Sequence, residues 1–94
     1  MIVNIRFIGS LRSESGKSGV RLDFQRNVPL REILKKLAEN KPNLGRALVG
    51  VELDDPRLNS LVILNGKEIS VLEGLDTMLK DRDEIVFVPV LHGG

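Results

Sequence analysis

The sequence predicts an α+β fold, with a mixed sheet of four to five strands and one main helix packed on one of its faces. Short apolar runs with a period of two lie at residues 2–8 and 20–24. A helical period follows over residues 29–40, and a strongly apolar run, residues 84–89, lies near the end. Strands and a helix in this order must bury one shared apolar face. A length of 94 residues suits one domain.

The first two strands are predicted to form a hairpin. Apolar side chains occupy every second position from Val3 to Phe7, and the same alternation recurs in residues 20–24. Between them, residues 13–19 are polar and rich in glycine and serine, which is typical of a turn.

The main helix is predicted over residues 29–40. Pro29 suits the first helical position, where a missing N–H costs little, and Asn40 followed by Pro42 supplies a stop signal. The helix should lie across one face of the sheet. Its apolar stripe comprises Leu30, Ile33, Leu34, Leu37 and Ala38.

Residues 41–59 carry the weakest pattern. Leu44, Ala47, Leu48 and Val51 have the spacing of a short helical turn, and residues 52–57 form an acidic run typical of a surface loop.

The C-terminal third predicts three more strands. Residues 61–64 are apolar, Asn65-Gly66 is a strong tight-turn signal, and residues 67–69 supply the return strand. A turn at residues 81–83 precedes the last strand, 84–89, which we expect in the centre of the sheet beside the first strand. We therefore expect a folded domain over residues 1–89 and a flexible tail over residues 90–94, with Pro89 ending the ladder.

Alternation along the late strands separates a buried face from an exposed one. Side chains predicted to point inward are Val62, Leu64, Ile85 and Phe87. The predicted outward set is Ile63, Val86 and Val88, which would form a docking patch near the root of the tail. The alternative is a set of scattered surface aliphatics, which are common.

Composition argues against an active site within the chain. There is no cysteine and one histidine, His92, so neither a thiolate nor a metal-binding cluster is expected. We therefore expect a protein that is not an enzyme and that binds no metal or cofactor itself. A net charge of +1 and three aromatic residues give no case for direct nucleic-acid binding. No apolar run is long enough for a membrane span and no secretory leader is visible, so a cytoplasmic location is expected.

The sequence ends on two glycines, Gly93 and Gly94. Glycine has no Cβ, so such an end can enter a narrow slot and present an unhindered carboxylate. A carboxylate is a poor acyl donor until ATP converts it to an acyl-adenylate, and a partner enzyme must supply the ATP and magnesium. The activated glycyl group could then pass to sulfur or to a lysine. An ordinary frayed end is the alternative.

The closing segment also resembles a known family. Residues 79–90, followed by Leu91-His92-Gly93-Gly94, are similar to the ending Leu-x-x-Gly-Asp-Glu-Val-x-Phe-x-Pro-Pro-Val-x-Gly-Gly of the MoaD, ThiS and ubiquitin-related modifier proteins. These are ubiquitin-like β-grasp sulfur carriers, with archaeal small modifiers among their relatives. Two positions depart from the pattern: Arg82 replaces the usual turn glycine, and Val90 replaces a second proline.

The resemblance implies that the chain is a carrier whose Gly94 is adenylated by a ubiquitin-activating-type (MoeB/ThiF-like) enzyme and converted to a thiocarboxylate. The acceptor would be a molybdopterin precursor, through a MoaE-like subunit, or a tRNA, through a thiolating enzyme. Residues expected to contact partners are Ile63, Val86, Val88, Pro89, Leu91 and His92, with Gly93 and Gly94 at the reacting end. Two alternatives remain: a modifier joined to lysines, and a non-covalent interaction module.

Overall fold

The computed structural model describes residues 1–49 and 60–90. Val51, the acidic loop expected at residues 52–57 and the tail residues 91–94 lie outside these ranges.

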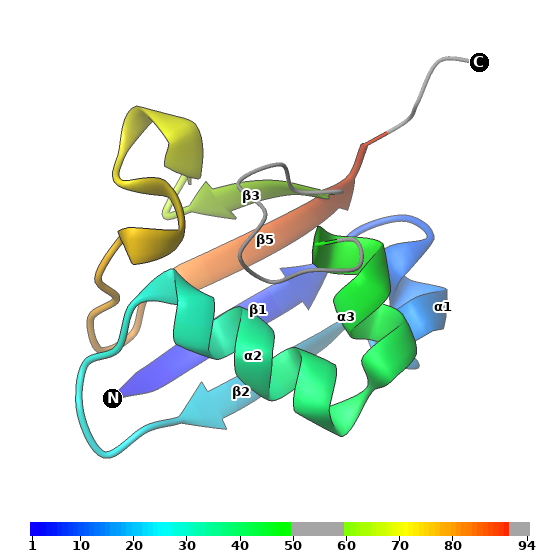
Figure 1. Cartoon of the computed structure of the whole chain (residues 1–94), viewed down its shortest axis with the longest axis horizontal. Helices are drawn as coiled ribbons and strands as arrows, with labels where there is room; N and C mark the ends of the chain where they lie inside the picture. Colours follow the sequence, from blue (N-terminus) through cyan, green and yellow to red (C-terminus); the bar gives the residue numbers. More distant parts are fainter. Residues whose placement is uncertain (50–59, 91–94) are drawn as a thin grey trace.

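A mixed five-stranded sheet forms the body of the molecule (Figure 1). The strands run in the spatial order β2-β1-β5-β3-β4, with β1 and β5 parallel and the other neighbouring pairs antiparallel. The predicted mixed sheet is confirmed, as is the central position of the last strand beside the first. The strands are β1 (Ile2–Phe7), β2 (Gly19–Asp23), β3 (Ser60–Leu64), β4 (Lys67–Glu68) and β5 (Glu84–Pro89).

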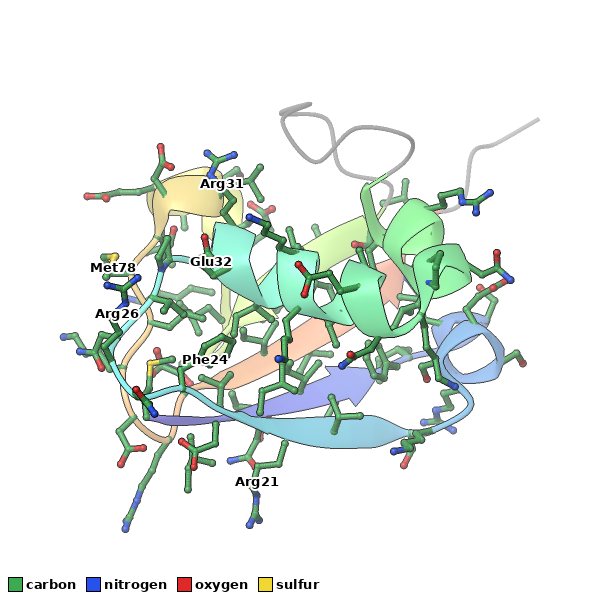
Figure 2. The ribbon with its side chains drawn as sticks, turned by 60° about the horizontal axis from the view of Figure 1, so that its bottom comes forward. Arg21, Phe24, Arg26, Arg31, Glu32 and Met78 are labelled. Atoms are coloured by element: carbon green, nitrogen blue, oxygen red, sulfur yellow. The ribbon has the colours of Figure 1, made fainter. Side chains whose placement is uncertain are left out.

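Two helices cover one face of this sheet (Figures 1 and 2). The predicted main helix is α2 (Leu30–Asn40), with Pro29 directly before its first residue. The apolar spacing at residues 44–48 belongs to a full second helix, α3 (Pro42–Val49), not to a single turn. Pro42 is therefore both the stop signal for α2 and the first residue of α3, a position at which proline is well tolerated.

The core lies between the sheet and these helices. Phe7 and Phe87 are fully buried register partners on β1 and β5, and their rings stack with centroids 6.0 Å apart. Four of the five apolar positions predicted for the α2 stripe are buried, and Ala38 is half-buried. The core thus contains strands from the first and the last parts of the sequence, because β1 and β5 are neighbours in the interior of the sheet.

The connection between β1 and β2 differs from the prediction. Instead of a polar turn throughout, it contains a short helix, α1 (Leu11–Ser15), which ends at Gly16 in the left-handed conformation with φ 76°. Leu11 is 2% exposed and belongs to the core. Burial of this one leucine explains the helix, which the surrounding polar residues conceal in the sequence.

The predicted turn at Asn65-Gly66 is confirmed, with φ values of 50° and 86° at its two residues. The return strand is shorter than expected. β4 ends at Glu68, and Ile69 begins a 3₁₀ turn, η1 (Ile69–Val71), followed by a second one, η2 (Gly74–Asp76). Ile69 leaves the strand because its side chain enters the core, where it is 3% exposed. The carboxylate of Glu68 accepts the N–H of Ser70 at 2.8 Å and so caps η1.

Candidate functional site

The C-terminal end of β5 carries the residues that lead to the two terminal glycines. β1 and β3 hold β5 from both sides: the Ile8 N–H donates to the Phe87 carbonyl at 3.0 Å, and Ser60 is the register partner of Pro89. The sheet therefore fixes the direction of the chain as far as Pro89. Gly93 and Gly94 themselves, with Leu91 and His92, lie outside the described residues.

The predicted inward face of the late strands is confirmed. Val62, Ile85 and Phe87 are at most 1% exposed, and Leu64 is 8% exposed. The alternate side chains of β5, Val86 and Val88, are half-buried. They lie on the face of the sheet opposite the helices, because successive side chains of a strand point to opposite faces.

The register brings the outward aliphatic residues together. Ile63 pairs with Val86, and Leu61 pairs with Val88, so four side chains form a two-by-two block on β3 and β5. We call Leu61, Ile63, Val86 and Val88 the β3–β5 patch. Leu61 is 40% exposed, whereas the side chains of the other three residues are half-buried. The predicted outward trio is thus contiguous, although its role in docking stays a prediction.

Two members of this surface were missed in the sequence. Leu61 has the same parity as Ile63, so the period of two was a sufficient signal for it. Val90 has the same parity as Val88 and is 42% exposed. It carries the apolar surface one step further toward the C-terminus.

Pro89 lies on the other side of the strand from the patch. It follows Phe87 in the alternation, and a Cβ added to Gly9 would lie 3.3 Å from its Cγ. Its ring therefore packs against the turn after β1, so any contact with a partner would come from a different direction than that of Val86 and Val88.

A hollow of about 500 Å³ adjoins the patch at the edge of β3. Leu61 and Val90 line it on one side, and residues of η1 and η2 line it on the other. Arg31 of α2 reaches its rim and forms an ion pair with Asp76 at 2.9 Å. A side chain from a partner could enter this hollow beside the root of the tail.

The described residues contain neither a candidate metal-binding group nor a helix that could span a membrane. Within residues 1–49 and 60–90, no group of three or more His, Cys, Asp or Glu residues is placed to hold a metal ion. Among these same residues, none of the helices has the length and apolar character that crossing a bilayer demands.

The sheet order, the helix across one face and the projecting last strand define a ubiquitin-like β-grasp protein. Two solved structures share this fold over nearly their whole length. The small archaeal modifier protein 1 from Methanosarcina acetivorans is 28% identical, with a TM-score of 0.80 and coverage of 99% of this chain and 96% of the other. The Haloferax volcanii HVO 2177 protein has a TM-score of 0.81 and 24% identity, covering 100% and 87%.

The chain belongs to the ThiS family, whose model matches residues 5–94. This is a family of ubiquitin-like sulfur carriers and modifiers. Small archaeal modifier protein 3 of H. volcanii is 26% identical over the whole of both chains. Ubiquitin-related modifier 1 of Mus musculus is 36% identical over 62 residues, which is 66% of this chain but 56% of the mouse protein. The match thus spans little more than half of that relative.

Proposed function

We propose that the protein is a sulfur carrier whose Gly94 carboxylate is activated by a partner enzyme and converted to a thiocarboxylate. The observation that carries the proposal is the β3–β5 patch on the strand that leads into the terminal glycines. A partly exposed aliphatic block, beside a strand whose direction the sheet fixes, suits an enzyme that must bind the domain while it holds the chain end. Membership of the ThiS family supports the same reaction class.

The chemistry needs two steps. An oxygen of the Gly94 carboxylate attacks the α-phosphate of ATP, which releases pyrophosphate and leaves an acyl-adenylate. A sulfur nucleophile, a sulfide or an enzyme persulfide, then attacks the carbonyl carbon and AMP departs; a persulfide route also needs a reducing thiol to free the thiocarboxylate. Glycines at positions 93 and 94 leave the carbonyl open to both nucleophiles.

The adenylating enzyme, of the MoeB/ThiF-like type, would bind ATP and magnesium. The carrier itself supplies no cofactor in this proposal. Its β3–β5 patch would dock on the enzyme, and Pro89, Leu91 and His92 would contact the channel that leads to the nucleotide. The thiocarboxylate would then donate sulfur to a molybdopterin precursor through a MoaE-like subunit, or to a tRNA through a thiolating enzyme.

Conjugation to lysine is the second candidate function. The names of two relatives, ubiquitin-related modifier 1 and small archaeal modifier protein 3, favour it. The same acyl-adenylate would serve, with a lysine amine replacing sulfur as the final nucleophile. The two functions share the activation step and differ in the acceptor.

The deciding experiment is the intact mass of the protein after incubation with ATP, magnesium, a sulfur donor and the adenylating enzyme of the same cell. A carrier gains the mass difference of one oxygen exchanged for one sulfur, and a variant lacking Gly94 does not. Lysines that bear residues 83–94 as a branch after tryptic digestion of cell extracts would assign the modifier function, because Arg82 is the last site for trypsin before the glycines. An unchanged mass with an active control enzyme and no trapped adenylate would overturn both and leave a non-covalent interaction module.

A further inference from the structure

The strand β2 forms the edge of the sheet farthest from β3 and β4. At its two ends the Phe7 N–H donates to the Ser18 carbonyl at 2.9 Å, and the Phe24 N–H donates to the Met1 carbonyl at 2.8 Å. In an antiparallel pair, hydrogen-bonded positions alternate with positions that face the other way. The backbone N–H and C=O groups of Gly19, Arg21 and Asp23 therefore point away from β1, along an edge that no other strand covers in the described chain.

A groove of about 210 Å³ runs between this edge and the end of α2. Val20 and Leu22 of β2 line it and are half-buried, although they alternate toward the helices. The buried side chains of Leu37 and Leu44 form its floor. An apolar groove beside a free strand edge has the two elements that β-strand addition uses: backbone partners for affinity and pockets for alternate side chains.

The charged residues that line the groove are all basic: Lys17, Arg21 and Lys41. The ion pairs found among the described residues join Met1 to Asp23, Arg31 to Asp76 and Arg82 to Asp81, and none of them involves these three cations.

The positive charge is concentrated at one end of the groove. The side chain of Arg21 projects from the sheet on the face opposite α2 (Figure 2), where its Nε donates to Asn4 Oδ1 at 3.3 Å. Lys17 and Lys41 are exposed and lie together: a Cβ added to Gly16 would be 3.0 Å from Lys41 Nζ. At the other end of β2, Asp23 lies 3.6 Å from the Met1 amine. The groove is thus cationic near Gly19, and Asp23 at the other end of β2 is not among the residues that line it.

We propose that this groove binds an extended segment of a partner protein that has a run of aliphatic residues followed or preceded by an acidic run. The segment adds to β2 as a sixth strand and forms hydrogen bonds with the outward backbone groups of Arg21. Its aliphatic side chains enter the groove beside Val20 and Leu22, and its acidic run lies against Lys17 and Lys41. This site is on the edge strand β2, whereas the β3–β5 patch is on the face of the sheet away from the helices, so the inference does not depend on the proposed function.

The test is an NMR titration of the full chain with a synthetic acetylated peptide, Val-Ile-Val-Ile-Asp-Glu-Asp-Glu, and with the same residues in reverse order. Both orders are needed because a strand can add parallel or antiparallel. The tighter binder should shift the amide signals of Arg21 and Asp23 and the methyl signals of Val20 and Leu22. A peptide with lysines in place of the acidic residues should bind about tenfold more weakly or worse.

Three variants separate the contribution of charge from that of the backbone. Lys17→Glu combined with Lys41→Glu should weaken binding about tenfold, because two attractive contacts become repulsive. Lys67→Glu combined with Lys80→Glu changes the net charge equally at exposed sites outside the groove, and should leave binding unchanged. Arg21→Pro removes an N–H that faces away from β1, a position where an edge strand tolerates proline, and should abolish binding.

Three results would overturn the proposal: no shift at millimolar peptide, shifts confined to the β3–β5 patch, or equal affinity for the acidic and basic peptides. A second copy of the chain is the rival occupant of the edge. Concentration-dependent dimers without peptide, lost in Arg21→Pro, would assign the groove to self-association instead. Since the lysine variants carry only exposed changes, their result stands even where Arg21→Pro fails to fold.

Discussion

Arg82 occupies a backbone conformation that residues with a Cβ rarely adopt, with φ 70°. It stands where the family pattern has a glycine, and the structure keeps the glycine-like conformation. Neighbouring bonds hold the turn: the Arg82 N–H donates to the Ile2 carbonyl at 2.7 Å, and Asp81 Oδ1 accepts the Ile2 N–H at 2.7 Å. Asp83 accepts the Lys80 N–H at 2.7 Å. These contacts outweigh the local strain.

Arg82→Gly should therefore raise the free energy of unfolding by about 0.5–1 kcal/mol. Relief of the left-handed strain contributes about 1–2 kcal/mol, and the greater freedom of glycine in the unfolded chain offsets part of it. Chemical denaturation measures the change. Arg82→Ala is the matched control, because it removes the same exposed side chain and keeps the strain. Equal stability of the glycine and alanine variants would contradict this account.

At the scale of elements, the packing of α2 against α3 depends on Gly45. A Cβ on this residue would lie 2.6 Å from the Cβ and 2.9 Å from the Cα of Ala38. Both atoms are fixed by α2, so a flexible side chain cannot move aside. This close approach lets α2 and α3 pack side by side. The helical layer over the sheet therefore comprises both helices, and not the eleven residues of α2 alone.

Gly45→Ala should lower the free energy of unfolding by about 1–2 kcal/mol, because overpacking outweighs the gain in helix propensity. Thermal or urea unfolding checks it. Asn43→Ala, at an exposed position of the same helix, gains propensity without the clash and should be neutral or slightly stabilising. A Gly45→Ala protein as stable as the Asn43→Ala protein would show that the helices separate at little cost.

At the scale of the whole molecule, the fold separates two surfaces. The β3–β5 patch lies on the face away from the helices and beside the exit of the chain, whereas the β2 groove lies on the helix side at the other edge. A partner at one surface leaves the other accessible. The proposed activating enzyme and the proposed peptide ligand would therefore occupy separate surfaces of the sheet.

Substitutions in the β3–β5 patch and at Gly94 should change different kinetic constants in an adenylation assay. Leu61→Ala with Val88→Ala should raise the KM for the carrier severalfold with little change in kcat, because the patch contributes binding that is the same in ground and transition states. Gly94→Ala should lower kcat. Val71→Ala is the control, since Val71 is 74% exposed and outside the patch. A KM unchanged by the patch variant, or raised equally by Val71→Ala, would argue against docking at this face.

Much of the element structure was predictable because its cause is local. A period of two or 3.6 records which way successive side chains point, and Asn65-Gly66 specifies its own turn. At Leu11 and Ile69, the local pattern predicted the wrong secondary structure. Each sits among polar or strand-like neighbours, yet each is buried in the core, and burial there converts an expected turn into α1 and an expected strand into η1.

By itself, the sequence determined the α+β class, the main helix, the inward faces of the late strands and the terminal glycines that suggest acyl chemistry. The tertiary structure alone decided which outward residues meet, because pairing of Leu61 with Val88 is set by the register of two strands. It also decided that β2 is a free edge and that Lys17 and Lys41 share one end of a groove. Those features depend on residues far apart in the chain, whose proximity arises only when the core closes.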